Sequence, residues 1–261
     1  MFPALWISRT GLEAQQTELG VVSNNLANAS TTGFKRDRAV FADLVYQNVR
    51  QAGGQTTQDT QAPSGLMLGT GVRAVATEKL HTQGNLVQTG NELDVAIQGR
   101  GFLQVLMPDG RISYTRDGAL QRDGEGRLVT ANGQPLEPAI NIPQDAVSVS
   151  IGSDGTVSAS IAGQPAPIQI GQLELADFVN PAGLTPIGEN LFTETAASGP
   201  PILGLPGIEG RGTLLQSTLE SSNVNVVEEL VNMIETQRAY EMNSRAIATA
   251  DEMLQYVAQT L

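Results

Sequence analysis

Few side chains in this sequence occupy positions from which they could carry out catalysis. His81 is the only histidine, so a Ser-His-Asp site could be built only around it, and nothing near it suggests a nucleophile. We therefore expect His81 to be a satisfied histidine in a loop or at the surface. Four aspartates each precede a glycine, which is typical of turns in which the carboxylate bonds to nearby backbone: Asp109, Asp117, Asp123 and Asp154.

Ligand sets for metals and cofactors are not visible either. The chain has no cysteine, which excludes disulfides and thiolate metal sites. The acidic stretch from Asp117 to Glu125 does not have the ligand spacing of a calcium loop. Gly99-Arg100-Gly101 is too short for a dinucleotide fingerprint, and no helical pattern follows it. The sequence therefore predicts no enzyme, no cofactor, and no catalytic or metal site. An enzyme would require an activity that is lost when His81 or a turn aspartate is changed.

Composition limits the partners of the protein. Charged residues make up 16% and hydrophobic residues 40% of the chain, so it is globular by composition. A formal net charge of −12 argues against nucleic acid or an anionic membrane as a partner. No stretch is long and apolar enough to span a bilayer, and none resembles a cleaved signal peptide. These signals alone predict a cytosolic protein without membrane insertion.

The last forty or so residues, Ser221 to Leu261, predict a long helix. Asn225 is placed as an N-cap, with Glu228 and Glu229 in the first turn. Apolar residues then recur at intervals of seven, with Leu230 filling part of a second position, as in a coiled-coil seam. The seam consists of Met233, Tyr240, Ile247, Leu254 and Leu261.

The other end of the chain has a matching pattern. Leucines recur at intervals of seven in a helix expected from Pro3 to about Asn28: Leu5, Leu12, Leu19 and Leu26. The two helices could be ordinary core helices of one domain. However, a second apolar stripe on the C-terminal helix indicates more than one neighbour: Ala239, Met242, Ala246, Ala250, Met253 and Val257. We therefore expect both ends to order on one another during assembly.

Between the helices the pattern changes twice. Residues 46–72 contain a stretch rich in Gln, Thr and Gly, punctuated by Pro63, which predicts a linker or long loop that docks through Leu66 and its neighbours. From Val72 to about Leu219 the apolar period is two and turn dipeptides are frequent, which predicts antiparallel strands. The fold class is therefore α+β, with paired terminal helices and an all-β middle.

Two strings resemble the signatures of the bacterial flagellar rod and hook protein family. The first runs from Asn24 to Lys35, and its motif residues are Asn25, Leu26, Ala27, Asn28, Gly33, Phe34 and Lys35. The second runs from Glu229 to Glu241. Asp94 to Phe102 also resembles the central β motif of the family, although Leu103 stands where relatives often have a second aromatic residue.

The resemblance implies a structural subunit of a hollow rod with helical symmetry. It implies that the terminal helices form the inner layer and polymerisation seam, and that residues 46–72 are the rod-stiffening segment of distal rod subunits, from Gln47 and Gln61 through Pro63 to Leu66. It also implies export through the flagellar type III apparatus without a cleaved signal, and so a periplasmic location. The implied partners are further copies, proximal rod proteins, the hook or hook–rod junction, and a ring bushing around the rod.

The predicted domains follow from these segments. Residues 1–45 and 221–261 would form the helical polymerisation domain, 46–72 the extended segment, and 73–220 the β-rich domain. Two alternatives stay open. The chain could be another rod or hook subunit of the same family, or it could be a coiled-coil dimeric scaffold or adhesin with a β head.

Overall fold

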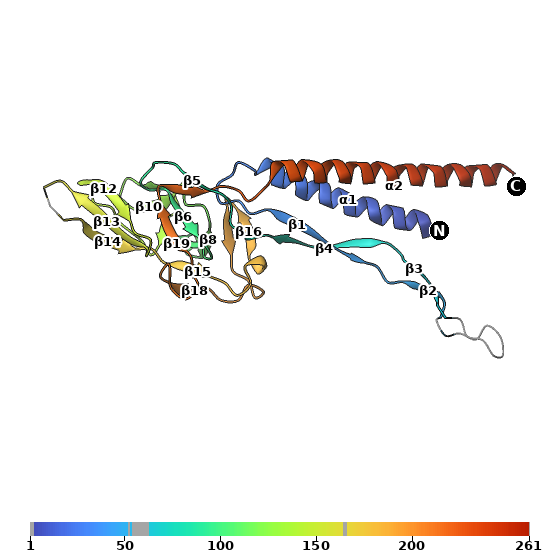
Figure 1. Cartoon of the computed structure of the whole chain (residues 1–261), viewed down its shortest axis with the longest axis horizontal. Helices are drawn as coiled ribbons and strands as arrows, with labels where there is room; N and C mark the ends of the chain where they lie inside the picture. Colours follow the sequence, from blue (N-terminus) through green and yellow to red (C-terminus); the bar gives the residue numbers. More distant parts are fainter. Residues whose placement is uncertain (1–2, 52, 54–62, 164–165, 261) are drawn as a thin grey trace. The chain divides into compact units, whose positions relative to one another are not determined.

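The computed structural model describes residues 3–51, 53, 63–163 and 166–260 of the chain (Figure 1). The chain forms two compact units, each built from separate stretches. The helical unit consists of Met1–Ala27, Asp37–Glu78 and Asn225–Leu261, and the β unit of Asn28–Arg36 and Lys79–Val224. The chain therefore passes from one unit to the other four times. These are units of packing, and the functional domains named above stay a prediction.

Both predicted terminal helices are present and pack together in the helical unit. Helix α1 spans Pro3–Ala27 and helix α2 spans Val226–Thr260 (Figure 1). The side chain of Asn225 accepts hydrogen bonds from the backbone N–H groups of Val227 at 3.1 Å and Glu228 at 3.5 Å, so it is the N-cap of α2. Among the described residues, neither helix has the length and apolar character needed to cross a membrane.

A narrow two-stranded ribbon completes the helical unit. Strand β1 (Asp37–Asp43) pairs with β4 (Val72–Lys79), and β2 (Gln47–Arg50) pairs antiparallel with β3 (Leu66–Leu68). The prediction of a loop here was wrong for β2 and β3. Residues 47–50 are mostly polar and do not alternate, so the sequence gives no strand signal there.

The β unit is antiparallel throughout its described strand pairings, as predicted. Its largest sheet has five strands in the order β11-β7-β8-β17-β16. Their bounds are Leu136–Glu137, Leu103–Leu106, Ile112–Thr115, Leu191–Thr193 and Thr185–Gly188. A second sheet has the order β12-β13-β14, with bounds Ala146–Ile151, Thr156–Ile161 and Ile168–Gln172.

Four further strand pairs and one short helix are present among the described residues of this unit. The pairs are β5 (Leu86–Gln88) with β20 (Thr218–Glu220), β6 (Val95–Gln98) with β19 (Thr213–Gln216), β9 (Leu120–Arg122) with β10 (Leu128–Thr130), and β15 (Leu175–Asp177) with β18 (Ile202–Gly204). The 3-10 helix η1 spans Pro181–Gly183.

The β unit has a core of its own. Aliphatic side chains from its sheets form one buried cluster, which includes Val95, Ile97, Leu103, Leu175 and Leu214. An aromatic cluster forms a second one, made of Phe102, Tyr114, Ala176, Phe178, Leu184 and Phe192. The stretch with the period-two pattern contains this core. Strands β6 and β7 each have three consecutive buried residues, so their side chains are covered on both faces.

Candidate assembly interface

The two terminal helices meet along small and polar residues. The side-chain amide of Asn25 donates to Glu229 Oε2 at 3.2 Å, and a Cβ added at Gly11 would lie 3.1 Å from Asn243 Nδ2. Gly11 precedes Asn25 by 14 residues, and Glu229 precedes Asn243 by 14 residues, so the helices run antiparallel.

These contacts belong to two lines of residues spaced by seven. The line on α1 is Gly11, Glu18 and Asn25, and the line on α2 is Glu229, Thr236, Asn243 and Ala250; all are buried or half-buried. Burial raises the pKa of the Glu18 carboxyl, and the nearby charge of Glu229 raises it further. Leucine side chains are absent from both lines, so these seven-residue repeats are distinct from the leucine repeat of the sequence.

Asn25 joins three elements of the helical unit. Its side chain is 1% exposed and pairs with the backbone of Asp37 in both directions, because its Nδ2 donates to the carbonyl and its Oδ1 accepts from the N–H, each at 2.8 Å. The same Nδ2 also donates to Glu229. The amide therefore holds the end of α1 against the start of β1 and the first turn of α2.

Replacing Asn25 with Ala should lower the free energy of unfolding of the helical unit by about 2–3 kcal/mol, because it removes hydrogen bonds from the half-buried backbone of Asp37 and from the buried carboxylate of Glu229. Urea unfolding followed by the fluorescence of Trp6, which lies on α1 and is the only tryptophan, measures this. Asn24→Ala is the matched control, since Asn24 is exposed. Equal losses in the two variants would contradict this role of Asn25.

The predicted seam residues occupy mixed positions. On α1, Ala14 and Val22 are buried, whereas Leu5, Leu12, Leu19 and Leu26 are half-buried. On α2, Met233 and Ile247 are half-buried, and Leu230 and Tyr240 are exposed. Leu254 lies in α2 but its side chain is outside the description, and Leu261 lies outside the described residues. The described seam residues are thus partly half-buried and partly exposed, and their role in polymerisation stays a prediction.

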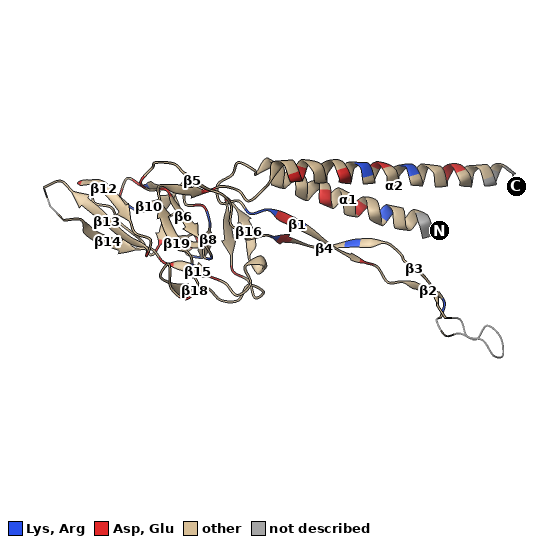
Figure 2. Ribbon diagram, viewed as in Figure 1, with Lys and Arg blue, Asp and Glu red and all other residues tan. Residues whose placement is uncertain are grey.

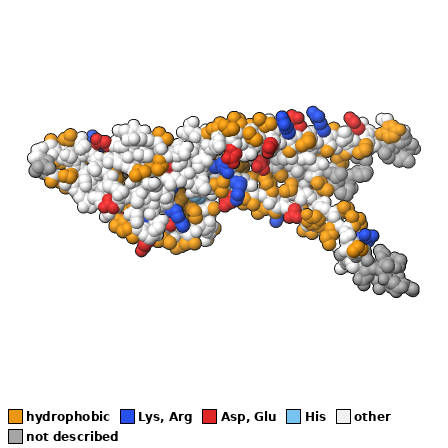
Figure 3. All heavy atoms as spheres, in the orientation of Figure 1, with side chains coloured by type: hydrophobic (Ala, Val, Ile, Leu, Met, Phe, Trp, Pro, Cys, Tyr) orange, Lys and Arg blue, Asp and Glu red, His pale blue; other side chains and the backbone are white. Residues whose placement is uncertain are grey.

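The side of α2 away from α1 carries large exposed apolar residues. We call the following set the outer stripe: Val227, Val231, Ile234, Met242, Met253 and Tyr256. Its members recur at spacings of three, four, eight and eleven, so they share one face of the helix. Basic side chains occur along the same helix (Figure 2), and apolar side chains cover its exposed side near the first turns (Figure 3). An exposed apolar face of this length marks an interaction surface.

The β2–β3 ribbon also exposes apolar side chains. Gln47 pairs with Leu68 and Asn48 with Met67, so Leu68 and Met67 point to opposite faces. Apolar residues that are exposed here are Val45, Tyr46, Val49, Leu66, Met67 and Leu68. Of the predicted rod-stiffening residues, Gln47 and Leu66 lie in the paired strands, Pro63 lies exposed just before β3, and Gln61 lies outside the described residues. Both faces of this ribbon are therefore available to neighbours.

The family motif is divided between the two units. Asn25, Leu26 and Ala27 are the last residues of α1, whereas Asn28, Gly33, Phe34 and Lys35 belong to the β unit. Gly33 has a φ of +67°, and a Cβ added there would lie 2.7–2.9 Å from backbone atoms of Arg116 and Asp117. A side chain at this position would therefore collide with backbone, and glycine is required.

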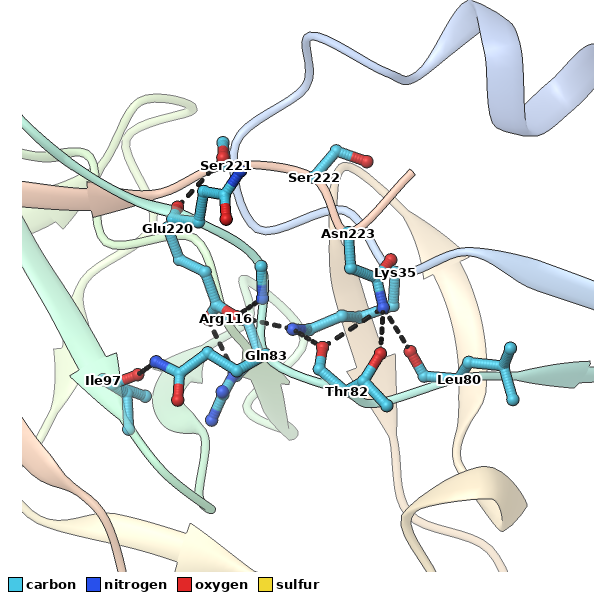
Figure 4. Close-up of polar contacts among 12 residues, drawn as sticks. Lys35, Leu80, Thr82, Gln83, Ile97, Arg116, Glu220, Ser221, Ser222 and Asn223 are labelled. Carbon is cyan, nitrogen blue, oxygen red and sulfur yellow. Dashed lines mark hydrogen bonds and ion pairs between the residues drawn. The ribbon is translucent and has the colours of Figure 1, made fainter. Parts of the chain in front are cut away.

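Lys35 is the centre of a buried ionic network in the β unit (Figure 4). Its Nζ donates to Glu220 Oε1 and to the Thr82 carbonyl, each at 2.7 Å, and its side chain is fully buried. The other oxygen of Glu220 accepts from Arg116 Nε at 3.1 Å. Arg116 also donates to the carbonyls of Gly99 and Gly101. Burial lowers the pKa of the Lys35 ammonium, the Arg116 charge lowers it further, and Glu220 partly offsets both.

Three aspartates that precede glycines have structural partners. Asp109 accepts from the Arg111 side chain, and that hydrogen bond lowers the pKa of its carboxyl. Asp123 is paired with Arg127, and Asp154 accepts from the backbone N–H of Thr156. These contacts are those of turn aspartates, as predicted.

His81 lies in a loop, as predicted, but it packs inside the aromatic cluster. Both ring nitrogens are buried without a hydrogen-bond partner among the described residues, so the expectation of a satisfied histidine was wrong. Its ring centroid is 5.4 Å from that of Phe102 and 5.6 Å from that of Phe192. Burial lowers the pKa of His81 to about 4, and the charges of Lys35, Arg116 and Lys79 contribute to the shift. The imidazole is therefore neutral near pH 7 and fills space between aromatic rings.

This pKa predicts an acid sensitivity of the β unit. His81 titrates at its ordinary 6.5 in the unfolded chain and at about 4 in the folded one, so the unfolded state binds the extra proton between these values. The free energy of unfolding should fall by up to about 3 kcal/mol as the pH drops from 6.5 to 4. Urea unfolding of the native chain and of His81→Phe across this range gives the difference. A parallel pH dependence of the two proteins would refute the assignment.

Three family models match separate parts of the chain. The model described as flagella basal body rod protein matches residues 5–35, which cover α1 and the motif up to Lys35. The flagellar hook protein FlgE/F/G D1 domain model matches residues 96–159, in the β unit. The flagellar basal body rod FlgEFG protein C-terminal model matches residues 215–260, which include α2. Paired terminal helices that flank a β unit in the sequence, matched in this order, define a rod or hook type of flagellar protein.

Relatives of similar length narrow this class. The chain is 60% identical to the flagellar basal-body rod protein FlgG of Buchnera aphidicola subsp. Schizaphis graminum, over 99% of this chain and 100% of the relative. It is 37% identical to FlgG of Bacillus subtilis, over 98% and 97% of the two chains. The flagellar hook-basal body complex protein FlhP of Bacillus subtilis is 31% identical, over 97% of each chain. The chain belongs to the flagellar basal-body rod protein family, and it is a structural protein of the flagellar basal body.

Proposed function

We propose that this protein is a subunit of the distal rod, which polymerises with helical symmetry into a stiff, hollow tube. The observation that carries the proposal is the outer stripe of α2, because α1 contacts the opposite side of α2 and leaves this stripe exposed. Contacts between different surfaces of identical subunits do not close on themselves and generate open helical filaments. The FlgG name of the relatives supports the assignment to the rod.

The helix pair would act as a coiled-coil-like inner domain. Its residues spaced by seven on both helices support this geometry. Small and polar side chains in the α1–α2 contact would let the two helices approach closely, while the large apolar side chains point to neighbouring subunits. The polymerisation domain would then comprise residues 1–45 and 221–261, with residues 73–220 as the outer β-rich domain.

The tube would transmit torque and conduct exported subunits, without catalysis. We infer that the chain leaves the cytoplasm through the type III export apparatus without a cleaved signal and assembles in the periplasm. Its partners would be further copies, proximal rod proteins, the hook protein or hook–rod junction, and the ring bushing. The family membership supports these partners as a group.

The segment 46–72 would stiffen the rod by inserting between subunits. A two-stranded ribbon is marginally stable alone in water, and this one exposes apolar residues on both faces. Coverage of both faces requires two neighbours, so each ribbon would be held between two further chains of the tube.

Replacing Leu66, Met67 and Leu68 with Ser should therefore produce flexible or curved rods, because the ribbon keeps its backbone pairing but loses the apolar side chains that neighbours would cover. The persistence length in electron micrographs measures the effect, with a decrease of several-fold expected. Gln47→Ser in the same strand pair is the control. Straight rods from the triple variant would refute the stiffening role.

Electron microscopy of concentrated protein tests the assembly itself. The full chain should form straight tubes, and a chain without residues 1–30 and 225–261 should form none. Tubes from both would move the assembly contacts into the β unit. Discrete particles of fixed size from the full chain would favour a closed coiled-coil dimer. Curved tubes would favour a hook subunit of the same family, which the similarity to the hook-basal body protein FlhP keeps as an alternative.

A further inference from the structure

Two segments of the β unit lead to the terminal helices, one following α1 and the other preceding α2, and these two segments are hydrogen-bonded to each other. The Lys35–Glu220 ion pair joins the segment after α1 to the segment before α2, across 185 residues of sequence. The backbone N–H of Gly33 donates to the Glu220 carbonyl at 2.8 Å. The segment that follows α1 is thus tied to the segment that precedes α2.

Asn223 makes a second tie between the same segments. Its Oδ1 accepts from the backbone N–H of Arg36 at 2.7 Å. Its Nδ2 donates to the carbonyls of Leu80 at 2.7 Å and Thr82 at 3.1 Å (Figure 4). The third segment, which returns from β4, is held in this way as well. Every one of these contacts lies within the β unit.

We propose that Lys35, Glu220 and Asn223 are positioning residues that make the two helices of one chain pair with each other, and not with helices of another copy. This deepens the assembly function proposed above, but its test needs no polymer. Residues 28–225 separate the helices along the chain, whereas through the Gly33–Glu220 contact only residues 28–33 and 220–225 do so.

The shorter tether raises the local concentration of one helix at the other. The effective concentration of one end of a loop at the other falls with about the three-halves power of the loop length. Shortening the path from 198 to 12 residues therefore favours pairing within the chain by at most roughly 70-fold. Without the ties, helices at the high subunit concentrations of assembly would exchange between chains, as in domain swapping.

The chain has no cysteine, which permits a direct test. Gly11→Cys and Asn243→Cys place two thiols at the α1–α2 contact. Mild oxidation of the purified full chain should give mainly a disulfide within one chain. The ratio of monomeric to dimeric disulfide product, at fixed protein concentration, measures the preference for pairing within the chain.

Lys35→Met in this background removes one of the two ties and should lower that ratio, by less than the roughly 70-fold ceiling set by the tether. Arg127→Gln, which removes an exposed ion pair of the β unit, is the matched control and should leave it unchanged. Amide exchange of β7 and β8 reports whether the β unit stays folded. An unchanged ratio of monomeric to dimeric product, with the amides of β7 and β8 still protected from exchange, would overturn the proposal.

If the amides of β7 and β8 lose their exchange protection in Lys35→Met, Asn223→Ala takes its place in the test, because it removes the second tie without removing a buried charge. A lower ratio of monomeric to dimeric product in Asn223→Ala would then support the proposal, and an unchanged ratio would overturn it. Absence of the disulfide within the chain in the double-cysteine reference would also overturn the proposal, since it would mean that the helices of one chain do not meet.

Discussion

Ile234→Asp should abolish rod formation while leaving the free subunit folded. Ile234 lies in the outer stripe of α2 and is 49% exposed, so a polar side chain is tolerated there in the monomer. Exposed substitutions of this kind change the free energy of unfolding by about 0.5 kcal/mol or less.

The assembled state responds differently. In the proposed tube the outer stripe is buried against a neighbouring copy, and an unpaired carboxylate buried there costs several kcal/mol at every contact. Because each subunit contributes the same contact, the penalty is repeated along the whole filament. We expect the critical concentration for polymerisation to rise beyond the accessible range, by at least about 100-fold at roughly 1.4 kcal/mol per factor of ten.

Sedimentation and electron microscopy measure this outcome. Ser244→Asp is the matched control, because Ser244 is also exposed on α2, lies outside the outer stripe and gains the same charge. Rods from Ile234→Asp at the native concentration would remove the outer stripe from the assembly interface. A loss in both variants would point to the net charge of α2 as the cause.

Glu220→Gln should destabilise the β unit by about 3–5 kcal/mol, the range for breaking a buried ion pair from one side. Its carboxylate pairs with two buried cations, Lys35 at 2.7 Å and Arg116 at 3.1 Å. Glu220 Oε1 also accepts from the backbone N–H of Gly84 at 2.8 Å. In Glu220→Gln this N–H and Lys35 Nζ would compete for a single neutral amide oxygen.

Lys35→Met should have a smaller effect on the same unit. It leaves Glu220 paired with Arg116, whose guanidinium keeps the carbonyls of Gly99 and Gly101. The double variant should be more stable than Glu220→Gln alone, since it removes one of the two unpaired cations.

Urea unfolding of the four proteins, read by amide exchange in β7 and β8, completes this double-mutant cycle. Equal losses from Glu220→Gln and Lys35→Met would show that the two charges act as an isolated pair. A double variant no more stable than Glu220→Gln would contradict the charge argument and leave packing as the cause.

The sequence predicted both helices, including the N-cap at Asn225, because helix signals are local. The period-two pattern also predicted strands in the stretch that contains β6 and β7, with their buried residues Val95, Ile97, Leu103 and Val105. These features depend on neighbours a few residues apart, which are visible in the sequence.

The helix contact was less accessible to such reasoning. A search for apolar repeats finds the leucines of α1, but the observed line passes through Gly11, Glu18 and Asn25, one position earlier in each repeat. Polar residues in a contact are recognised only once their partners are known, and the partner of Asn25 lies 204 residues away. The repeated spacing of seven in Gly11, Glu18 and Asn25 was the one available signal.

The β2 and β3 strands were missed for a related reason. Residues 47–50 have no alternation, and their pairing partner follows a stretch rich in Gln, Thr and Gly. Lys35 was identified only through its family motif, because no local pattern indicates that a lysine will be buried against Glu220.

The interleaved composition of the two units also determines the order in which the chain can fold. The helical unit needs its first and last segments together, and the β unit closes around Lys35 only when Glu220 is present. A chain that emerges end first from a narrow channel can therefore complete neither unit until nearly all of it has passed. Long-range contacts of this kind also slow folding through their loop entropy. If the chain is exported as proposed, this topology would delay the folding of both units until nearly all of the chain has left the channel.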